Sequence, residues 1–108
     1  MPVHNKLVRD KILQIIEESG KDYSSIILDE KEYVLQLRKK LLEEIDEYLS
    51  AKNDNEAIEE LADILEVVNC LAKIHKVNPE KLEHVRKDKE DKRGSFKEKV
   101  FLIEVHDE

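Results

Sequence analysis

Acidic side chains in the middle of the chain are spaced so that they could bind a metal ion. Glu43 and Glu44 are followed by Glu47, and Glu60 is followed by Asp63. Glu44 and Glu47 are three positions apart, as are Glu60 and Asp63, and side chains at this spacing project from one face of a helix. Carboxylate oxygens suit hard divalent cations, so the pattern favours Mg²⁺, with Mn²⁺ as the alternative.

The two acidic pairs are placed symmetrically about a polar break at residues 52–55, which reads Lys-Asn-Asp-Asn. If the chain turns back here as an antiparallel helical hairpin, all four carboxylates reach about the same height. Four like charges at one level repel one another unless a cation lies among them. The alternative interpretation is two solvated helix faces, because 26 of the 108 residues are acidic.

Length and composition predict a single all-α domain spanning residues 1–108, large enough for one core. A hydrophobic content of 40% excludes a wholly disordered chain, and 42% charged residues with only two Gly and two Pro favour helices. The net charge of −7 argues against a general binder of nucleic-acid polymers. A nucleotide substrate stays open, since a bound metal and local basic residues can reverse the charge where it matters.

The sequence does not predict a membrane or secreted protein. It has no apolar stretch of about 18 residues, and its N-terminus is polar rather than signal-like. A single cysteine excludes an intrachain disulfide. We therefore expect a cytoplasmic protein.

Four helices are expected from the helical spacing of apolar residues. Their predicted ranges are Asn5 to about Glu18, Asp29 or Glu30 to about Ser50, Asp54 to about His75, and Pro79 to about Lys92. Asn5, Asp54 and Asn78 are the expected N-caps. Residues 22–28 would form a small strand or an extended segment packed on the bundle. The apolar residues Val100–Val105 are expected to dock on the core.

Two of the predicted helices combine apolar and functional positions. Glu44 lies beside the apolar stripe of the second predicted helix, close to the buried face, where a carboxylate without a function is unusual. The third is apolar on more than one face between Leu61 and Ile74, as a central bundle helix or a subunit contact requires. Glu66 extends its acidic face by one turn and is a further candidate ligand.

Basic residues near both ends of the chain are candidates for binding phosphate. Lys6 and Arg9 are three positions apart near the N-terminus, and the other candidates are Lys89, Lys92 and Arg93. The alternative is that both groups are ordinary exposed helix charges, paired in the second case with neighbouring acids.

The acidic pattern, Glu43-Glu44-x-x-Glu47, twelve residues, then Glu60-x-x-Asp63, resembles the signature of the all-α nucleotide pyrophosphohydrolases. That superfamily includes MazG, the dimeric dUTPases and phosphoribosyl-ATP pyrophosphohydrolase. The opening Asn5-Lys-Leu-Val-Arg-Asp-Lys-Ile12 and the closing Lys92-Arg-Gly-Ser-Phe96 resemble its MazG-like, phosphoribosyl-ATP pyrophosphohydrolase-like branch. One departure is Ser95, a small residue where a second glycine is expected.

The resemblance implies a four-helix bundle-like enzyme that cleaves the α–β phosphate bond of a nucleoside triphosphate, giving a monophosphate and pyrophosphate. Position by position, it implies Glu44, Glu47, Glu60 and Asp63 as Mg²⁺ ligands and Glu43 as a nearby acid that either lies behind these ligands or orients water. Glu47 is our candidate for the general base. The five basic residues would hold the phosphate chain.

Family members assemble from two or more subunits, so the resemblance also implies a homodimer, with a tetramer as the alternative. Two other functions stay open. One is phosphoribosyl-ATP hydrolysis in histidine biosynthesis. The other is a non-catalytic helical-bundle interaction module, which metal binding would distinguish from an enzyme.

Overall fold

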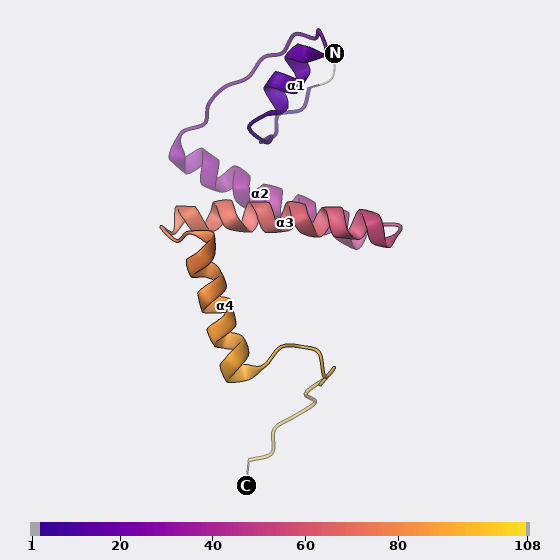
Figure 1. Ribbon diagram of the computed structural model, residues 1–108, viewed down its shortest axis with the longest axis vertical. Helices are drawn as coiled ribbons and strands as arrows, with labels where there is room; N and C mark the ends of the chain where they lie inside the picture. Colours follow the sequence, from indigo (N-terminus) through magenta and orange to yellow (C-terminus); the bar gives the residue numbers. More distant parts are fainter. Residues whose placement is uncertain (1–2, 108) are drawn as a thin grey trace.

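The structure, a computed structural model, describes residues 3–107 and contains four helices (Figure 1). They are α1 (Ile12–Glu18), α2 (Glu30–Leu49), α3 (Asp54–Ile74) and α4 (Pro79–Arg93). No strand occurs within these described residues, so the all-α class is confirmed and residues 22–28 are an irregular connection. Ile26 and Ile27 in that connection are exposed rather than packed on the helices.

The α2–α3 hairpin is the centre of the molecule, and its ends follow from local capping. The Asp29 carboxylate accepts a hydrogen bond from the Glu32 backbone N–H at 2.8 Å, which starts α2. Asn53 caps α3 in the same way, accepting from the Glu56 N–H at 2.9 Å. The prediction that Asp54 is the cap was therefore wrong by one residue. Asn53 has the extended backbone that an N-cap needs, whereas Asp54 is already helical.

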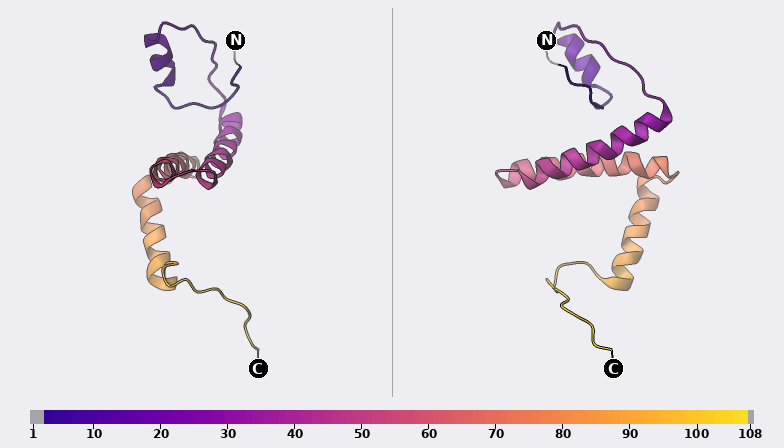
Figure 2. Two further views of the ribbon diagram at one scale, coloured as in Figure 1. Left: turned by 90° about the vertical axis from the view of Figure 1, so that its right-hand side faces the viewer. Right: turned by 180° about the vertical axis from the view of Figure 1, so that it is seen from behind.

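The interior of the hairpin is small. α2 and α3 lie side by side and antiparallel (Figure 2), and Leu37, Val67 and Ala72 are the described hydrophobic residues that are buried. Glu44 is buried as well, with 5% of its surface exposed. A carboxylate thus occupies a place in the hairpin interior that an apolar residue would otherwise fill.

The first helix is shorter than predicted. α1 begins at Ile12 instead of Asn5, and Asn5 has a positive φ of 45°, which is incompatible with helix. The Ile12 N–H donates to the Arg9 carbonyl at 3.1 Å, so a turn leads into the helix. α1 packs against none of the other three helices, and without a packing partner a longer helix has little to stabilise it.

The fourth helix leads away from the hairpin. Asn78 caps it by accepting from the Lys81 N–H at 2.8 Å, and Gly94 ends it with a φ of 82°, as predicted. Only the start of α4 lies near α3 (Figures 1 and 2), and the molecule measures 68 × 35 × 24 Å. The four helices therefore do not close into a compact bundle within one chain.

The C-terminal arm, residues 96–105, does not dock on the core, so that prediction was wrong for the single chain. Phe101 and Ile103 are 88% and 87% exposed. The arm starts at the far end of α4, and this helix carries it away from the hairpin (Figure 1).

None of the helices in the described residues is long and apolar enough to cross a membrane. The cytoplasmic location and the single domain stay predictions.

Candidate metal centre

The hairpin brings three of the predicted carboxylates together. Glu44 and Glu47 on α2 and Glu60 on α3 each offer one oxygen, and these oxygens all lie within 4.8 Å of one another. The hairpin turns at the polar break, as the symmetric spacing predicts. Glu44 and Glu47 of α2 therefore lie at the same level along the hairpin as Glu60 of α3. We call Glu44, Glu47 and Glu60 the acidic cluster.

Glu44 is the most buried member of the acidic cluster. Its Oε1 pairs with the Lys40 ammonium one helical turn earlier, at 3.2 Å. Its Oε2 is buried without a hydrogen-bond partner, and so is Oε2 of Glu60. Burying a carboxylate oxygen without a partner is costly, so both atoms favour a cation between the helices. Our sequence interpretation missed Lys40, although its position four residues before Glu44 was visible.

The electrostatics of Glu60 reflect the same crowding. A protonated Glu60 can donate to the Glu47 carboxylate and, less strongly, to that of Glu44; the first of these, then burial, and then the second raise the pKa of Glu60 to about 7. In the absence of a cation, the folded protein therefore holds a proton on Glu60 up to about neutral pH. A divalent cation would remove the need for that proton.

Asp63, the fourth predicted ligand, lies outside the acidic cluster. Its Oδ1 accepts a hydrogen bond from Arg9 Nη2 at 2.6 Å, an ion pair that joins the N-terminal segment to α3. Arg9, predicted to bind phosphate, is thus held beside the acidic cluster by a residue 54 positions away. Its partner on the same predicted face, Lys6, is exposed.

Two other predicted acids are not part of the cluster. Glu43 is half-buried and belongs to no group of converging ligands among the described residues. Glu66 is exposed and accepts a hydrogen bond from the Cys70 thiol at 3.8 Å. The role of Glu43 in orienting water stays a prediction.

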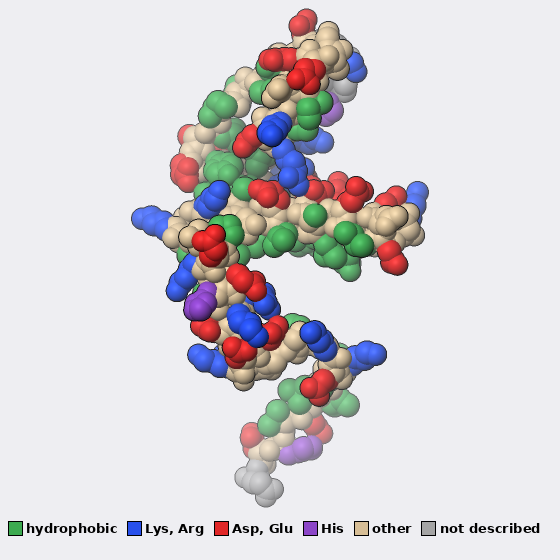
Figure 3. Space-filling view, in the orientation of Figure 1, with side chains coloured by type: hydrophobic (Ala, Val, Ile, Leu, Met, Phe, Trp, Pro, Cys, Tyr) green, Lys and Arg blue, Asp and Glu red, His purple; other side chains and the backbone are tan. Residues whose placement is uncertain are grey.

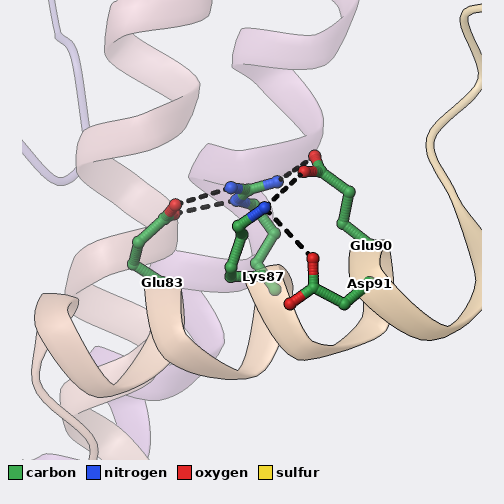
Figure 4. A network of polar contacts seen from close by, with 5 residues as sticks. Glu83, Lys87, Glu90 and Asp91 are labelled. Carbon is green, nitrogen blue, oxygen red and sulfur yellow. Dashed lines mark hydrogen bonds and ion pairs between the residues drawn. The ribbon is translucent and has the colours of Figure 1, made fainter.

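The predicted basic residues of α4 are not brought to the acidic cluster within one chain. Figure 4 shows how the neighbouring charges pair: Arg86 binds Glu83 and Glu90, while Lys87 binds Glu90 and Asp91. These contacts lower the pKa of Glu83 and Glu90 and raise that of Lys87. The predicted internal ion pairs are therefore present.

The remaining basic candidates on α4 make no such pairs. Lys89, Lys92 and Arg93 are exposed and form no ion pair within the described part of the chain. They lie toward the end of α4 that points away from the hairpin (Figure 1). Their binding of phosphate stays a prediction, and it would need α4 of another copy or a different position of this helix.

The hairpin has two contrasting faces. Acidic side chains line the edge that faces α1, and apolar side chains line the opposite edge (Figure 3). The apolar face is formed by large exposed residues of both helices: Leu35, Leu42 and Leu49 of α2, and Ile58, Leu61 and Leu65 of α3. In each helix these residues recur every three, four or seven positions, which aligns them in one stripe.

The chain matches no protein-family model, no curated protein and no solved structure.

Proposed function

We propose that the acidic cluster binds Mg²⁺, with Mn²⁺ as a substitute. The observation that carries this proposal is the orphaned Oε2 of Glu44, an oxygen of a buried carboxylate that lies among two other carboxylates. The donor set consists only of oxygens, which is the preference of both ions. Glu44, Glu47 and Glu60 would hold the ion, and Asp63 would join them through Oδ2 or by giving up the contact of its Oδ1 with Arg9.

We further propose that the chain is a nucleotide pyrophosphohydrolase, cleaving between the α- and β-phosphates of a nucleoside triphosphate or a related nucleotide. Bound Mg²⁺ would neutralise phosphate oxygens and promote attack by water. The −7 charge of the chain makes such an ion necessary for an anionic substrate to approach this face.

The residues of the chain itself have separable tasks in this proposal. Glu47 is the exposed member of the acidic cluster, so it can accept a proton from an attacking water. Arg9 is 59% exposed despite its contact with Asp63, which leaves its guanidinium available to a phosphate oxygen. Lys40 balances the buried charge of Glu44 from within the same helix.

We propose a dimer as the working state, with a tetramer as the alternative. The accessible surface of the chain is 10271 Å². A compact monomer of its mass, 12.7 kDa, would expose roughly 6,200 Å². The excess is about 4,000 Å² per chain, or about 8,000 Å² over two chains, which is larger than the roughly 2,000–5,000 Å² that most obligate interfaces bury in total.

Pyrophosphate release tests the function. Purified chain with Mg²⁺ is assayed on a panel of canonical and damaged triphosphates and on phosphoribosyl-ATP. We expect release that EDTA abolishes and that Glu60→Gln lowers at least about 100-fold, on the scale of losing one preorganised charged group. Asp46→Asn is the matched control, because it removes one exposed carboxylate of α2 outside the acidic cluster.

The panel also separates the alternatives. Turnover of phosphoribosyl-ATP alone would indicate the histidine-biosynthesis activity. Silence across the panel with Mg²⁺ binding intact would point to a nucleotide outside it. Silence without Mg²⁺ binding would overturn the catalytic proposal and leave a helical interaction module.

A further inference from the structure

The C-terminal arm carries a contiguous apolar run that nothing in its own chain covers. Val100, Phe101, Leu102 and Ile103 are between 73% and 88% exposed, and Val105 is 73% exposed. Monomeric proteins rarely leave such a run in water, because it is prone to aggregate unless another surface covers it. The arm therefore needs a binding surface outside the position it has here.

The run is apolar on both of its sides. In an extended segment successive side chains point to opposite sides, so Phe101, Ile103 and Val105 form one row, while Val100 and Leu102 begin the other. A segment laid on the outside of its own hairpin would bury only one row. Apolar residues in both rows are typical of a segment enclosed between two surfaces.

The apolar face of the hairpin has matching dimensions. Leu35 and Leu49 are fourteen residues apart on α2, which corresponds to about 21 Å along a helix. Residues 100–105 in extended form span about 17 Å, so the run fits within this length. Leu42 on this face is 64% exposed and Ile58 is 63% exposed, so the face is also uncovered.

A groove continues the apolar face toward α4. It has a volume of about 430 Å³ and is lined by Leu65, Val68, Pro79 and Leu82 among others. Leu65 belongs both to the groove and to the apolar face. The uncovered surface thus reaches the corner from which α4, and with it the arm, departs.

We propose that the arm is exchanged between two copies of the chain, each arm packing on the apolar face of the other copy's hairpin. The partner hairpin covers one row of the arm, and the body of its own copy covers the other. Folding the arm back within one chain would leave most of the excess surface exposed, since a ten-residue arm is too short to cover about 4,000 Å². Exchange also brings the surfaces of the two copies together, so it covers more than the arm alone. The proposal requires self-association and is independent of the hydrolysis proposed above.

Truncation combined with mass measurement is the first test. Chains ending at Lys99 and at Val105 are compared with the full chain by analytical ultracentrifugation over a range of concentrations. The Val105 end is the matched control, because it keeps the apolar run. We expect the full chain and the control to be dimers, and the Lys99 end to dissociate at least about 100-fold more readily.

A point variant covers the case in which truncation disturbs folding. Phe101→Glu keeps the length of the arm, and its helix content is checked by circular dichroism. We expect the same weakening with unchanged helicity. A Lys99-ended chain and a Phe101→Glu chain that both associate like the full chain would overturn the proposal, as would a monomeric full chain.

Crosslinking decides between exchange and folding back. In a Cys70→Ala background, Ile103→Cys and Leu42→Cys are made in separate chains and mixed. We expect a disulfide-linked pair in the mixture that neither chain forms alone. A doubly substituted chain that crosslinks only within itself when diluted would show that the arm folds back, and it would overturn the exchange.

Discussion

The acidic and apolar faces of the α2–α3 hairpin are built from the same two helices but are completed in different ways. On the acidic face, Lys40 pairs with Glu44, Arg9 pairs with Asp63, and the neighbouring carboxylates raise the pKa of Glu60. On the apolar face, no described residue of the same chain covers the exposed leucines. Charges can be balanced by one long side chain or by an ion, whereas apolar area is removed from water only by more protein surface.

This contrast explains how one short chain can present both a ligand site and an association surface. The small interior, with Leu37 the least exposed hydrophobic residue at 3%, separates the two faces. Each face then depends on something that approaches from outside: a cation and an anionic substrate on one side, and a second copy on the other.

The largest effect is expected in the interior that both faces share. Leu37→Ala should lower the free energy of unfolding by about 2–5 kcal/mol, because it leaves a cavity between α2 and α3. The loss should not depend on protein concentration. Leu42→Ala, on the apolar face, should instead destabilise only at concentrations where copies associate. Urea denaturation of both variants at two concentrations checks this, and equal behaviour of the two would contradict the separation of interior and face.

Metal binding should stabilise only through the acidic face. At 100 times its dissociation constant, Mg²⁺ should raise the unfolding free energy of the parent by about 2.7 kcal/mol. Glu44→Gln should abolish this increment and Asp46→Asn should keep it. Thermal unfolding in EDTA and in excess Mg²⁺ gives the increment for each protein. An increment that survives in Glu44→Gln would place the ion elsewhere.

The raised pKa of Glu60 predicts that the stability of the metal-free protein depends on pH. The pKa of Glu60 rises from 4.5 to about 7 on folding, so between these values the folded state holds a proton that the unfolded state has lost. This group therefore makes unfolding easier as the pH rises from about 4.5 to 7. In EDTA, the parent should lose more stability over that window than Glu60→Gln does. Urea midpoints at pH 5 and pH 8 measure the difference, and an equal loss of stability in both proteins would contradict the raised pKa of Glu60.

The smallest effect is expected at the ion pair that closes the acidic face. Arg9→Ala should cost less than about 1 kcal/mol of stability, because the arginine and aspartate side chains are 59% and 36% exposed. The same variant should weaken the binding of a triphosphate, while Arg9→Lys retains part of it. Calorimetric titration with a non-hydrolysable analogue provides the readout. If Arg9→Ala bound the triphosphate as tightly as the parent, the role of Arg9 would be restricted to holding the N-terminal segment on α3.

The second, third and fourth helices were predictable from the sequence because their start signals act locally. Asp29 and Asn78 cap their helices through backbone N–H groups three residues away, and the polar break at residues 52–55 makes the hairpin turn. The start of α1 was predicted wrongly. Asn5 is a residue type that often caps helices. A short helix, however, is stabilised mainly by packing on other elements, and α1, with seven residues, packs on no other helix.

Some features of the candidate site were likewise predictable from the sequence and others were not. Helical periodicity placed Glu44, Glu47 and Glu60 on facing sides of one hairpin, and the structure brings them together. Periodicity did not identify the contact between Arg9 and Asp63, because it joins residues 54 positions apart through an irregular segment. It also did not determine which carboxylate would be buried, although it placed Glu44 at the margin of the core.

By itself, the sequence determined the helical class, the hairpin and the four candidate carboxylates on its facing sides, three of which meet in the structure, since all of these follow from periodicity and capping within a few turns. Only the tertiary structure decided that Glu44 is buried with an unpartnered oxygen, that Arg9 holds Asp63, and that the arm and the apolar face stay uncovered in one chain. Those features depend on where α1 and α4 lie relative to the hairpin. No local interaction specifies that placement, because neither helix packs extensively on the hairpin.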